Sequence, residues 1–349
     1  MADKLTKKPT RIHVPGVTYI FIIVFIVASI GVPRFFSVGN ISTMLLQACT
    51  LTLLSVAMAL SLMMGSIDLS IGGAVSMTGV IMAYAMRAGV HAALAILFGI
   101  AVGILFGLFN GLIVTKLKVP AFIATFGSMG IAQSIANTIS NERTISWEAG
   151  ANTKLIDILG SQAVSIKFGE DASQYLSISN LLIITVIAVG IVWFFFSKTT
   201  LGSNIYALGA NEETARLSGI NVSKCRILVF MISGFLASLG GIVVMVRTNS
   251  VQPTIGANLE FQACVAAVLG GNVMEGGKGS IPGAVLGALT LYSIRSAMSL
   301  LGIDTSWVQV VIGVVLVIGM VLNNIAAMGE KKKSSSRVKI KRAAEKGGV

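Results

Sequence analysis

Residues 181–196 read LLIITVIAVGIVWFFF, an apolar run in which polar and apolar side chains do not alternate. About 20 apolar residues cross the hydrocarbon core of a bilayer as an α-helix. A strand of a membrane β-barrel needs only about 10 residues, and its side chains alternate between lipid and lumen. The run therefore predicts a membrane-spanning helix. Asp, Glu, Lys and Arg are also absent from 35–67, 88–115, 119–141, 172–197, 227–246 and 305–329.

The composition of the whole chain is that of a membrane protein. Of its 349 residues, 54% are hydrophobic and 11% are charged, and the mean hydropathy is +0.86. A water-soluble domain is about one quarter charged. This chain therefore has too few charged residues to cover an apolar core with a polar shell. We expect an all-α fold, a polytopic transmembrane helical bundle.

The net charge of +12 is concentrated towards the ends of the chain. Eight of the 26 Lys and Arg residues lie in the last 19 residues, and four more lie in the first 11. Basic residues collect on the cytoplasmic side of membrane proteins. The charge therefore indicates topology, with attraction of the C-terminal tail to anionic membrane lipid, and not nucleic-acid binding.

We expect about ten membrane segments with both termini in the cytoplasm. An even number of spans puts the two termini on one side, and the Lys and Arg residues of the inside loops favour the cytoplasm. The transmembrane domain covers 15–326, between a basic N-terminal tail (1–14) and a basic, disordered C-terminal tail (327–349). The segments are 15–33, 42–64, 70–87, 92–115, 120–140, 178–197, 225–247, 258–274, 280–301 and 306–326.

Two connections between the expected segments are long. Residues 141–177 contain five acidic and three basic residues, which suits the periplasmic side. Residues 198–224 form the longest connection on the cytoplasmic side between two spans. The other connections are short, as in an antiparallel bundle.

Two glycine-rich breaks occupy matching places in the two halves of the chain. Residues 65–83 read GSIDLSIGGAVSMTGVIMA, and residues 270–289 read GGNVMEGGKGSIPGAVLGAL. Paired glycine-interrupted segments are the best sequence indication of a transporter's binding region. The alternative is that these glycines serve only close helix packing.

Asp68 lies between two apolar runs. A carboxylate in hydrocarbon costs roughly 2.5 kcal/mol or more, so it must face water, a partner or the backbone. Asp68 can cap the start of the next helix through free N–H groups. It can also take part in a solute pathway or gate. Both interpretations remain open.

The stretch 211–226, NEETARLSGINVSKCR, predicts a short helix on the cytoplasmic side. Asn211 can cap this helix, with Glu212 and Glu213 in its positive first turn. Gly219 can end it in a left-handed conformation. A short amphipathic helix of this kind suits docking to a partner, and the alternative is a helix that lies on lipid.

The sequence contains no pattern for chemistry on a substrate. GNVMEGGKGS (271–280) has Gly277 where a phosphate loop requires Lys, so we expect no ATP binding. His13 and His91 form no metal pattern, and Cys49, Cys225 and Cys264 have neither metal nor disulfide spacing. We therefore expect no enzyme activity, and no cofactor or metal bound by this chain.

Uncharged polar side chains are scattered through the expected spans. They suit a neutral, hydroxyl-rich solute, because a proton or cation pump would carry several intramembrane acids. Alternatively, they serve only to join helices through hydrogen bonds, each of which contributes about 0.6 kcal/mol to stability. They are Gln47, Asn110, Thr125, Ser128, Gln133, Asn137, Gln262, Gln309 and Asn323.

Four motifs resemble the ribose/xylose/galactose-type branch of ABC importer permeases. They are GSIDLSIGG (65–73), NGLIVTKLKVPAFIATFGSMGIA (110–132), ALGANEETARLSGINV (207–222) and VLGGNVMEGGKGSIPGAVLGA (268–288). The resemblance covers roughly 15–326 in the right order. It departs from the family pattern at Ala210, where a second Gly is common, and at Glu275, where a small residue is usual.

The resemblance implies a type II-like importer permease in a bacterial inner membrane. It implies a homodimer, or a heterodimer with a sister permease, two ABC ATPase subunits that use ATP and Mg, and a sugar-binding protein that delivers a monosaccharide. A pentose is the first expectation. The resemblance implies that the residues that couple the permease to the ATPase are Glu212, Glu213, Arg216, Leu217 and Gly219. The candidates for the pathway or gate are Asp68, Ser70, Asn110, Phe122, Thr125, Gln262 and Asn272.

Three other classes compete with this interpretation. A secondary transporter driven by an ion gradient would need intramembrane acids or unwound helices that bind Na⁺ or H⁺; Asp68 is the only clear acid that we identify. An intramembrane enzyme would need a nucleophile, a base or a metal pattern. A scaffold would not explain a glycine-broken helix pair in both halves.

Overall fold

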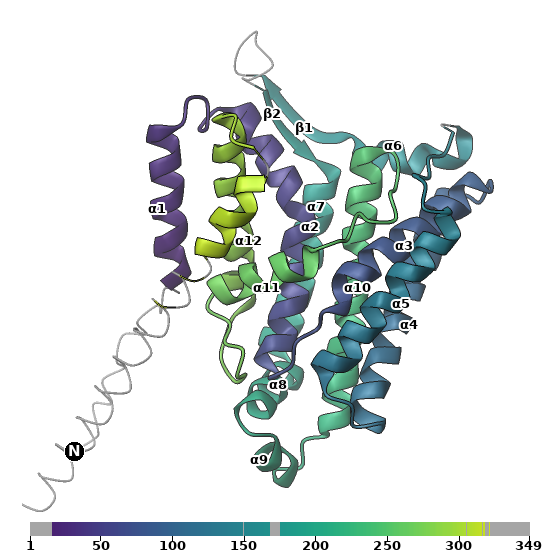
Figure 1. The fold of residues 1–349 in the computed structure, drawn as a ribbon, viewed down its shortest axis with the longest axis vertical. Coiled ribbons are helices and arrows are strands. Elements are labelled where there is room, and N and C mark those ends of the chain that lie inside the picture. Colours follow the sequence, from purple (N-terminus) through teal and green to yellow (C-terminus); the bar gives the residue numbers. More distant parts are fainter. Residues whose placement is uncertain are drawn as a thin grey trace, which may run out of the picture.

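The computed structural model describes residues 16–148, 150–167, 175–304, 306–315, 317 and 321. The two tails expected at 1–14 and 327–349 lie outside these residues. Most of the described chain is helical (Figure 1). The helices are α1 Gly16–Gly31, α2 Val38–Met63, α3 Ser70–Arg87, α4 Ala92–Lys116, α5 Ala121–Ser140, α6 Lys154–Gly160, α7 Asn180–Lys198, α8 Thr200–Ala210, α9 Glu212–Leu217, α10 Val222–Thr248, α11 Leu259–Leu269 and α12 Ile281–Leu300. A further apolar helix covers Ser306–Val315.

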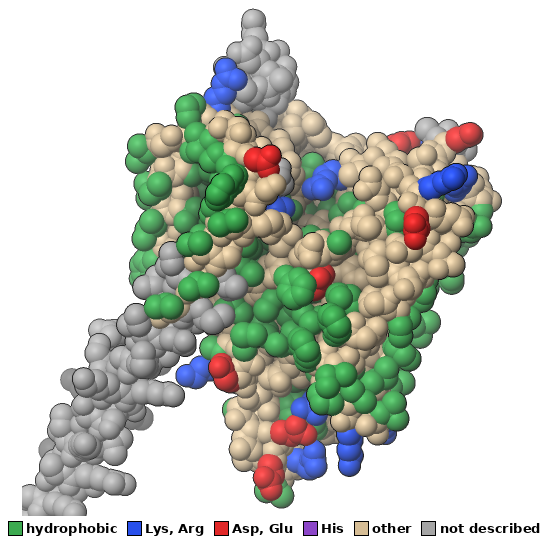
Figure 2. All heavy atoms as spheres, viewed as in Figure 1, with side chains coloured by type: hydrophobic (Ala, Val, Ile, Leu, Met, Phe, Trp, Pro, Cys, Tyr) green, Lys and Arg blue, Asp and Glu red, His purple; other side chains and the backbone are tan. Residues whose placement is uncertain are grey.

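A helix overlaps each range expected for a membrane segment, and α3 has the expected bounds, but α11 ends at Leu269, before the expected end at 274. The last expected segment, 306–326, is described only in part. Four helices within the described residues are long and apolar enough to cross a membrane, judged by length and composition: α2, α4, α7 and α10. Charged side chains gather mostly at the two ends of the molecule, and hydrophobic ones cover its flanks (Figure 2). This distribution is that of a protein surrounded by lipid.

The centre of the bundle is formed by α2 and α10, which pack against each other and are mostly buried. α10 also packs along α4, where backbones meet closely. A Cβ on Gly107 would collide with the carbonyl of Phe230, and one on Gly234 would collide with that of Gly103. Small residues allow such close approach between helices in membranes. Close packing is therefore the role of the glycines along α4.

The prediction of a purely helical protein was wrong for the connection 141–177. Strand β1 (Gln162–Lys167) pairs antiparallel with β2 (Tyr175–Ser179). In β1 the apolar Val164 and Ile166 are followed by the polar Ser165 and Lys167, an alternation typical of a strand. A 3-10 turn (Ala151–Thr153) and α6 precede the hairpin. The described part of this connection thus contains regular secondary structure.

The connection 198–224 holds two helices, of which only α9 was predicted. α8 was not predicted, because its sequence, TLGSNIYALGA, mixes Gly, Ser and Asn with apolar residues. It buries Ile205 and Leu208. Figure 1 shows α8 and α9 together at one end of the bundle, opposite the strands.

Each glycine-rich break begins with a non-helical part, before α3 or α12, and these two parts touch. The chain leaves helical structure between α2 and α3 and again between α11 and α12. The Gly277 N–H donates to the Met63 carbonyl at 2.9 Å. A Cβ on Gly65 would lie 3.5 Å from the Glu275 carbonyl oxygen. Segments more than 200 residues apart in sequence are therefore in backbone contact beside the end of α2.

Candidate functional site

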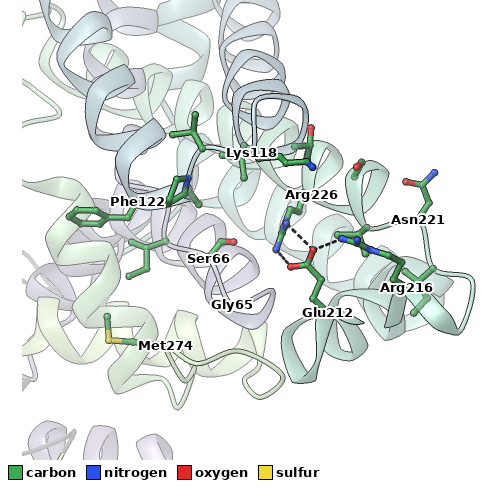
Figure 3. A pocket seen from close by; sticks show the side chains of 18 residues that line it. Gly65, Ser66, Lys118, Phe122, Glu212, Arg216, Asn221, Arg226 and Met274 are labelled. Carbon is green, nitrogen blue, oxygen red and sulfur yellow. Dashed lines mark hydrogen bonds and ion pairs between the residues drawn. The ribbon is translucent and has the colours of Figure 1, made fainter. Parts of the chain in front are cut away.

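A cavity of about 950 Å³ opens at the end of the bundle that carries α9 (Figure 3). Its walls come from the turn after α2, the connection between α4 and α5, α9 and the start of α10. Residues that line it include Ser66, Lys118, Phe122, Glu212, Arg226 and Met274. The cavity therefore joins the predicted coupling helix to both glycine-rich breaks, since Met274 belongs to the second break.

The local structure predicted for α9 is confirmed. The Asn211 side chain accepts from the Thr214 N–H at 2.8 Å and so caps the helix. Glu212 and Glu213 occupy the first turn, where the helix dipole favours acidic side chains. Gly219 has a φ of 84°, a left-handed conformation that glycine adopts without steric cost.

Glu212 is held by two arginines of the chain, and its own side chain is 39% exposed. Its Oε1 accepts from Arg216 Nη2 at 2.9 Å within α9. Its Oε2 accepts from Arg226 Nη2 at 2.7 Å, and Arg226 lies on α10. The Arg226 side chain is only 21% exposed, so water screens this pair less than a surface pair. The pair fixes α9 to α10.

Glu213 and Leu217 are exposed, unlike Glu212. Leu217 is 84% exposed, although the removal of an aliphatic side chain from water lowers the free energy. The ion pairs between described residues do not involve Glu213. α9 thus divides its predicted coupling residues: Glu212 and Arg216 form internal contacts, while Glu213 and Leu217 are available to a partner.

Asp68 lies at the centre of a buried polar cluster and is 2% exposed. Its Oδ1 accepts from the Ser70 N–H at 3.0 Å and from Ser70 Oγ at 2.6 Å. Its Oδ2 accepts from Ser233 Oγ at 2.6 Å. Asn110 Nδ2 donates to Ser70 Oγ at 2.9 Å. Asp68 thus satisfies the first N–H of α3, as the cap interpretation expected, although the N-cap position itself is Leu69. The cluster also joins α3, α4 and α10.

Thr125 supports the same turn from α5. Its Oγ1 accepts from the Leu69 N–H at 3.1 Å and donates to the Ala121 carbonyl at 2.8 Å. Four of the seven candidates for the pathway or gate are therefore brought together around the first glycine-rich break: Asp68, Ser70, Asn110 and Thr125.

Of the other three candidates, Gln262 and Asn272 bond elsewhere, whereas the Phe122 carbonyl accepts from Thr125 Oγ1 at 3.4 Å. Gln262 Oε1 accepts from Arg295 Nη2 at 3.0 Å. Asn272 closes the second break, because its Nδ2 donates to the Ala267 carbonyl at 2.7 Å and its Oδ1 accepts from the Ser280 N–H at 3.0 Å. Phe122 is 54% exposed, lines the cavity and stacks on Phe126.

α8 contacts both breaks, a role that the sequence did not indicate. Tyr206 OH donates to the Gly279 carbonyl at 2.8 Å. Burial raises the pKa of Tyr206, which keeps the phenol protonated and able to donate. A Cβ on Gly209 would collide with the Met63 carbonyl and the Gly277 nitrogen.

Glu260 was also missed. It lies in the first turn of α11, is 4% exposed and packs against Gly72. A Glu inside the expected segment 258–274 was the available signal. The identification of Asp68 as the only clear intramembrane acid was therefore wrong.

No metal site is apparent in the part of the chain that the structure describes. No group of three or more His, Cys, Asp or Glu side chains is placed to bind a metal ion among those residues. Cys49, Cys225 and Cys264 are unpaired thiols. Their apolar surroundings suit small core side chains.

Similar proteins are known over most of the chain. The ribose import permease protein of Haemophilus influenzae is 34% identical over 90% of this chain and 93% of its own length. The fructose import permease protein of Bifidobacterium longum is 30% identical over 90% of this chain and 91% of its own length. A solved metal-chelate type ABC transporter in an inward-facing conformation aligns with a TM-score of 0.47 and 15% identity, over 81% of this chain and 89% of that one.

A family match agrees with these relatives. Residues 40–320 match the family described as "Branched-chain amino acid transport system / permease component". That range runs from the start of α2 to beyond α12 and includes both glycine-rich breaks and α9. The chain therefore belongs to this family of transport-system permease components.

Proposed function

We propose that this chain is the membrane-spanning permease subunit of an ATP-driven ABC importer for a monosaccharide, with ribose or a related pentose as the favoured solute. Its family consists of permease components, and its relatives include import permeases for ribose and fructose. The chain itself supplies a route for the solute and no covalent chemistry.

The proposed assembly contains two permease chains, identical or sister, two ABC ATPase subunits and an extracytoplasmic sugar-binding protein. The chain crosses a bacterial inner membrane about ten times, with α8, α9 and both termini in the cytoplasm. The glycine-broken segments are the two matching elements of a pseudo-repeat that flanks the solute route. Support for this orientation comes from the basic residues of the inside loops.

One observation carries the coupling proposal: α9 presents Leu217 and Glu213 outward while Glu212 binds Arg226 of α10. When the ATPase subunits close on ATP, they push α9. The ion pair transmits this displacement to α10. The contacts of Tyr206 and Gly209 transmit it to the two glycine-rich breaks, because close-packed backbones cannot absorb a shift locally.

Replacement of Glu213 by Ala tests this proposal. The variant Glu213→Ala keeps the internal pairs of Glu212, so it should fold normally and lose transport while the ATPase continues to hydrolyse ATP. The matched control is Glu142→Ala, which removes an exposed acid from the opposite end of the bundle. Uptake by Glu213→Ala at the wild-type rate would remove this residue from the coupling contact.

A second candidate function is favoured by the two buried carboxyl groups. Asp68 and Glu260 are both nearly inaccessible, and the ion pairs between described residues involve neither. Buried acids in membrane spans are common in transporters driven by H⁺ or Na⁺. Solute uptake that follows an ion gradient without any ATPase, and that Asp68→Asn abolishes, would establish this function.

A further inference from the structure

A second cavity, of about 1240 Å³, lies at the end of the bundle opposite α9. It is bounded by the C-terminal ends of α3 and α5 and by the segment that follows α5. In the proposed topology this end faces the periplasm. The coupling site uses none of the residues that line this cavity.

The inner wall of this cavity is uncharged. Ser140 and Thr153 are buried there, and their hydroxyls bond to the backbone of Asn137 and Gly150. Met86 is buried and lines the same cavity. Trp147 lines the cavity while part of its ring packs against the core of the bundle. The indole supplies the cavity with a flat apolar surface and one N–H donor.

The rim of the cavity carries both signs of charge. Arg87, Arg143 and Glu148 are exposed there, and the ion pairs between described residues involve none of them. Charged side chains of both signs are visible at the corner of the molecule over the ends of α3 and α5 in Figure 2. Opposite charges around one hollow disfavour a ligand of high net charge.

The segment that supplies Trp147 is fixed in place. Ile145 and Val251 are buried and exchange two backbone hydrogen bonds of 2.8 Å. Asn152 Nδ2 donates to the Gly89 carbonyl at 3.2 Å. A site on a held segment loses less conformational entropy when it binds a ligand.

We propose that this cavity is an outer vestibule that binds the free monosaccharide before it enters the membrane, and this inference rests on the proposed function. The C–H face of a sugar ring is apolar and suits the indole of Trp147. Sugar hydroxyls donate and accept, and so suit Arg87, Arg143 and Glu148. The volume exceeds that of a typical ligand pocket of about 300–1,000 Å³, so water shares the site and the binding is weak.

Saturation-transfer difference NMR of D-ribose with the purified chain in nanodiscs tests the vestibule directly. The wild-type chain should give a saturable signal, and Trp147→Ala should reduce the apparent affinity by about tenfold, as loss of a central aromatic contact does. Trp147→Phe should restore most of it. The matched control Trp307→Ala removes an exposed Trp from outside the cavity and should bind as the wild type does.

Uptake with the ATPase and the binding protein is measured on the same preparations. A wild-type chain that transports ribose but gives no saturable signal overturns the vestibule alone. An unchanged signal in Trp147→Ala also overturns it. Weaker binding-protein affinity in Trp147→Ala without any free-sugar signal overturns it in favour of a protein-docking surface. A wild-type chain that transports no monosaccharide overturns the proposed function, and the vestibule with it.

Discussion

Glu212 on α9 and Arg226 on α10 form an ion pair, with Oε2 and Nη2 2.7 Å apart. Arg226 Nη1 approaches the same carboxylate at 3.5 Å. Arginine and carboxylate groups that meet at two points have a fixed relative orientation. The pair thereby makes a six-residue helix, too short to be stable alone, a firm extension of α10.

Replacement of Arg226 by Ala should separate α9 from α10. We expect solute uptake to fall by about tenfold or more, while the melting temperature decreases only slightly, because a partly exposed pair contributes about 1 kcal/mol. Uptake in proteoliposomes and thermal unfolding in detergent measure the two effects. The control Arg216→Ala removes the more exposed partner of Glu212 and should have a smaller effect. Equal effects of the two variants would contradict this account.

Loss of the Ser233 hydroxyl should destabilise the cluster around Asp68. Ser233→Ala removes a 2.6 Å bond to a buried carboxyl group and leaves Oδ2 without that donor. The expected loss in free energy of unfolding is about 1–3 kcal/mol. Chemical unfolding in detergent measures it, with Ser203→Ala on the exposed side of α8 as the control. A change no larger than that of the control would show that the hydrogen bond does not stabilise the protein.

A side chain at Gly209 should disturb the contact between α8 and the two breaks. Gly209→Ala places a methyl group against the Met63 carbonyl and the Gly277 nitrogen, so we expect both stability and uptake to fall. Gly190→Ala is the matched control, because a Cβ there has no neighbour within 4 Å. Alanine replaces a helical glycine favourably by roughly 0.5–1 kcal/mol. Wild-type uptake by Gly209→Ala would exclude this contact from coupling.

The Tyr206 hydroxyl gives a milder test of the same contact. Tyr206→Phe keeps the ring against Phe196 and removes only the bond to the Gly279 carbonyl. We expect a stability loss of about 1 kcal/mol and a reduced number of solute molecules moved per ATP. Parallel counts of uptake and hydrolysis provide that ratio, and an unchanged ratio would limit Tyr206 to a structural role.

Leu217 should matter for assembly and not for folding. Leu217→Asp alters a side chain that is exposed on the isolated chain. The free energy of unfolding of this variant should therefore stay within about 0.5 kcal/mol of the wild-type value. Co-purification of the ATPase should fall sharply. Leu301→Asp, at an exposed position outside the coupling region, is the control. Retention of the ATPase by Leu217→Asp would place the contact elsewhere.

The long apolar helices were predictable because a charge-free apolar run of about 20 residues is typical of a membrane-spanning helix. α3 and the cap at Asn211 followed from local sequence alone. The hairpin of β1 and β2 did not, because its short alternation is embedded in a polar connection. Glu260 was visible in the sequence but was passed over beside Asp68.

The partners of the candidate residues were beyond the sequence, since they come from tertiary packing. Ser233 is 165 residues from Asp68, and no local pattern links them. Arg226 was noticed only as a cytoplasmic charge, because the turn that brings it back to Glu212 depends on how α9 and α10 pack. The contact of α8 with both breaks could not be predicted from the sequence for the same reason.

The most direct test of the proposed importer is ribose uptake by proteoliposomes that contain this chain, its partner ATPase and its sugar-binding protein. The account predicts uptake only when ATP and all three components are present, with Na⁺ and H⁺ gradients collapsed. Uptake by the chain alone, driven by an imposed ion gradient and independent of ATP, would contradict it.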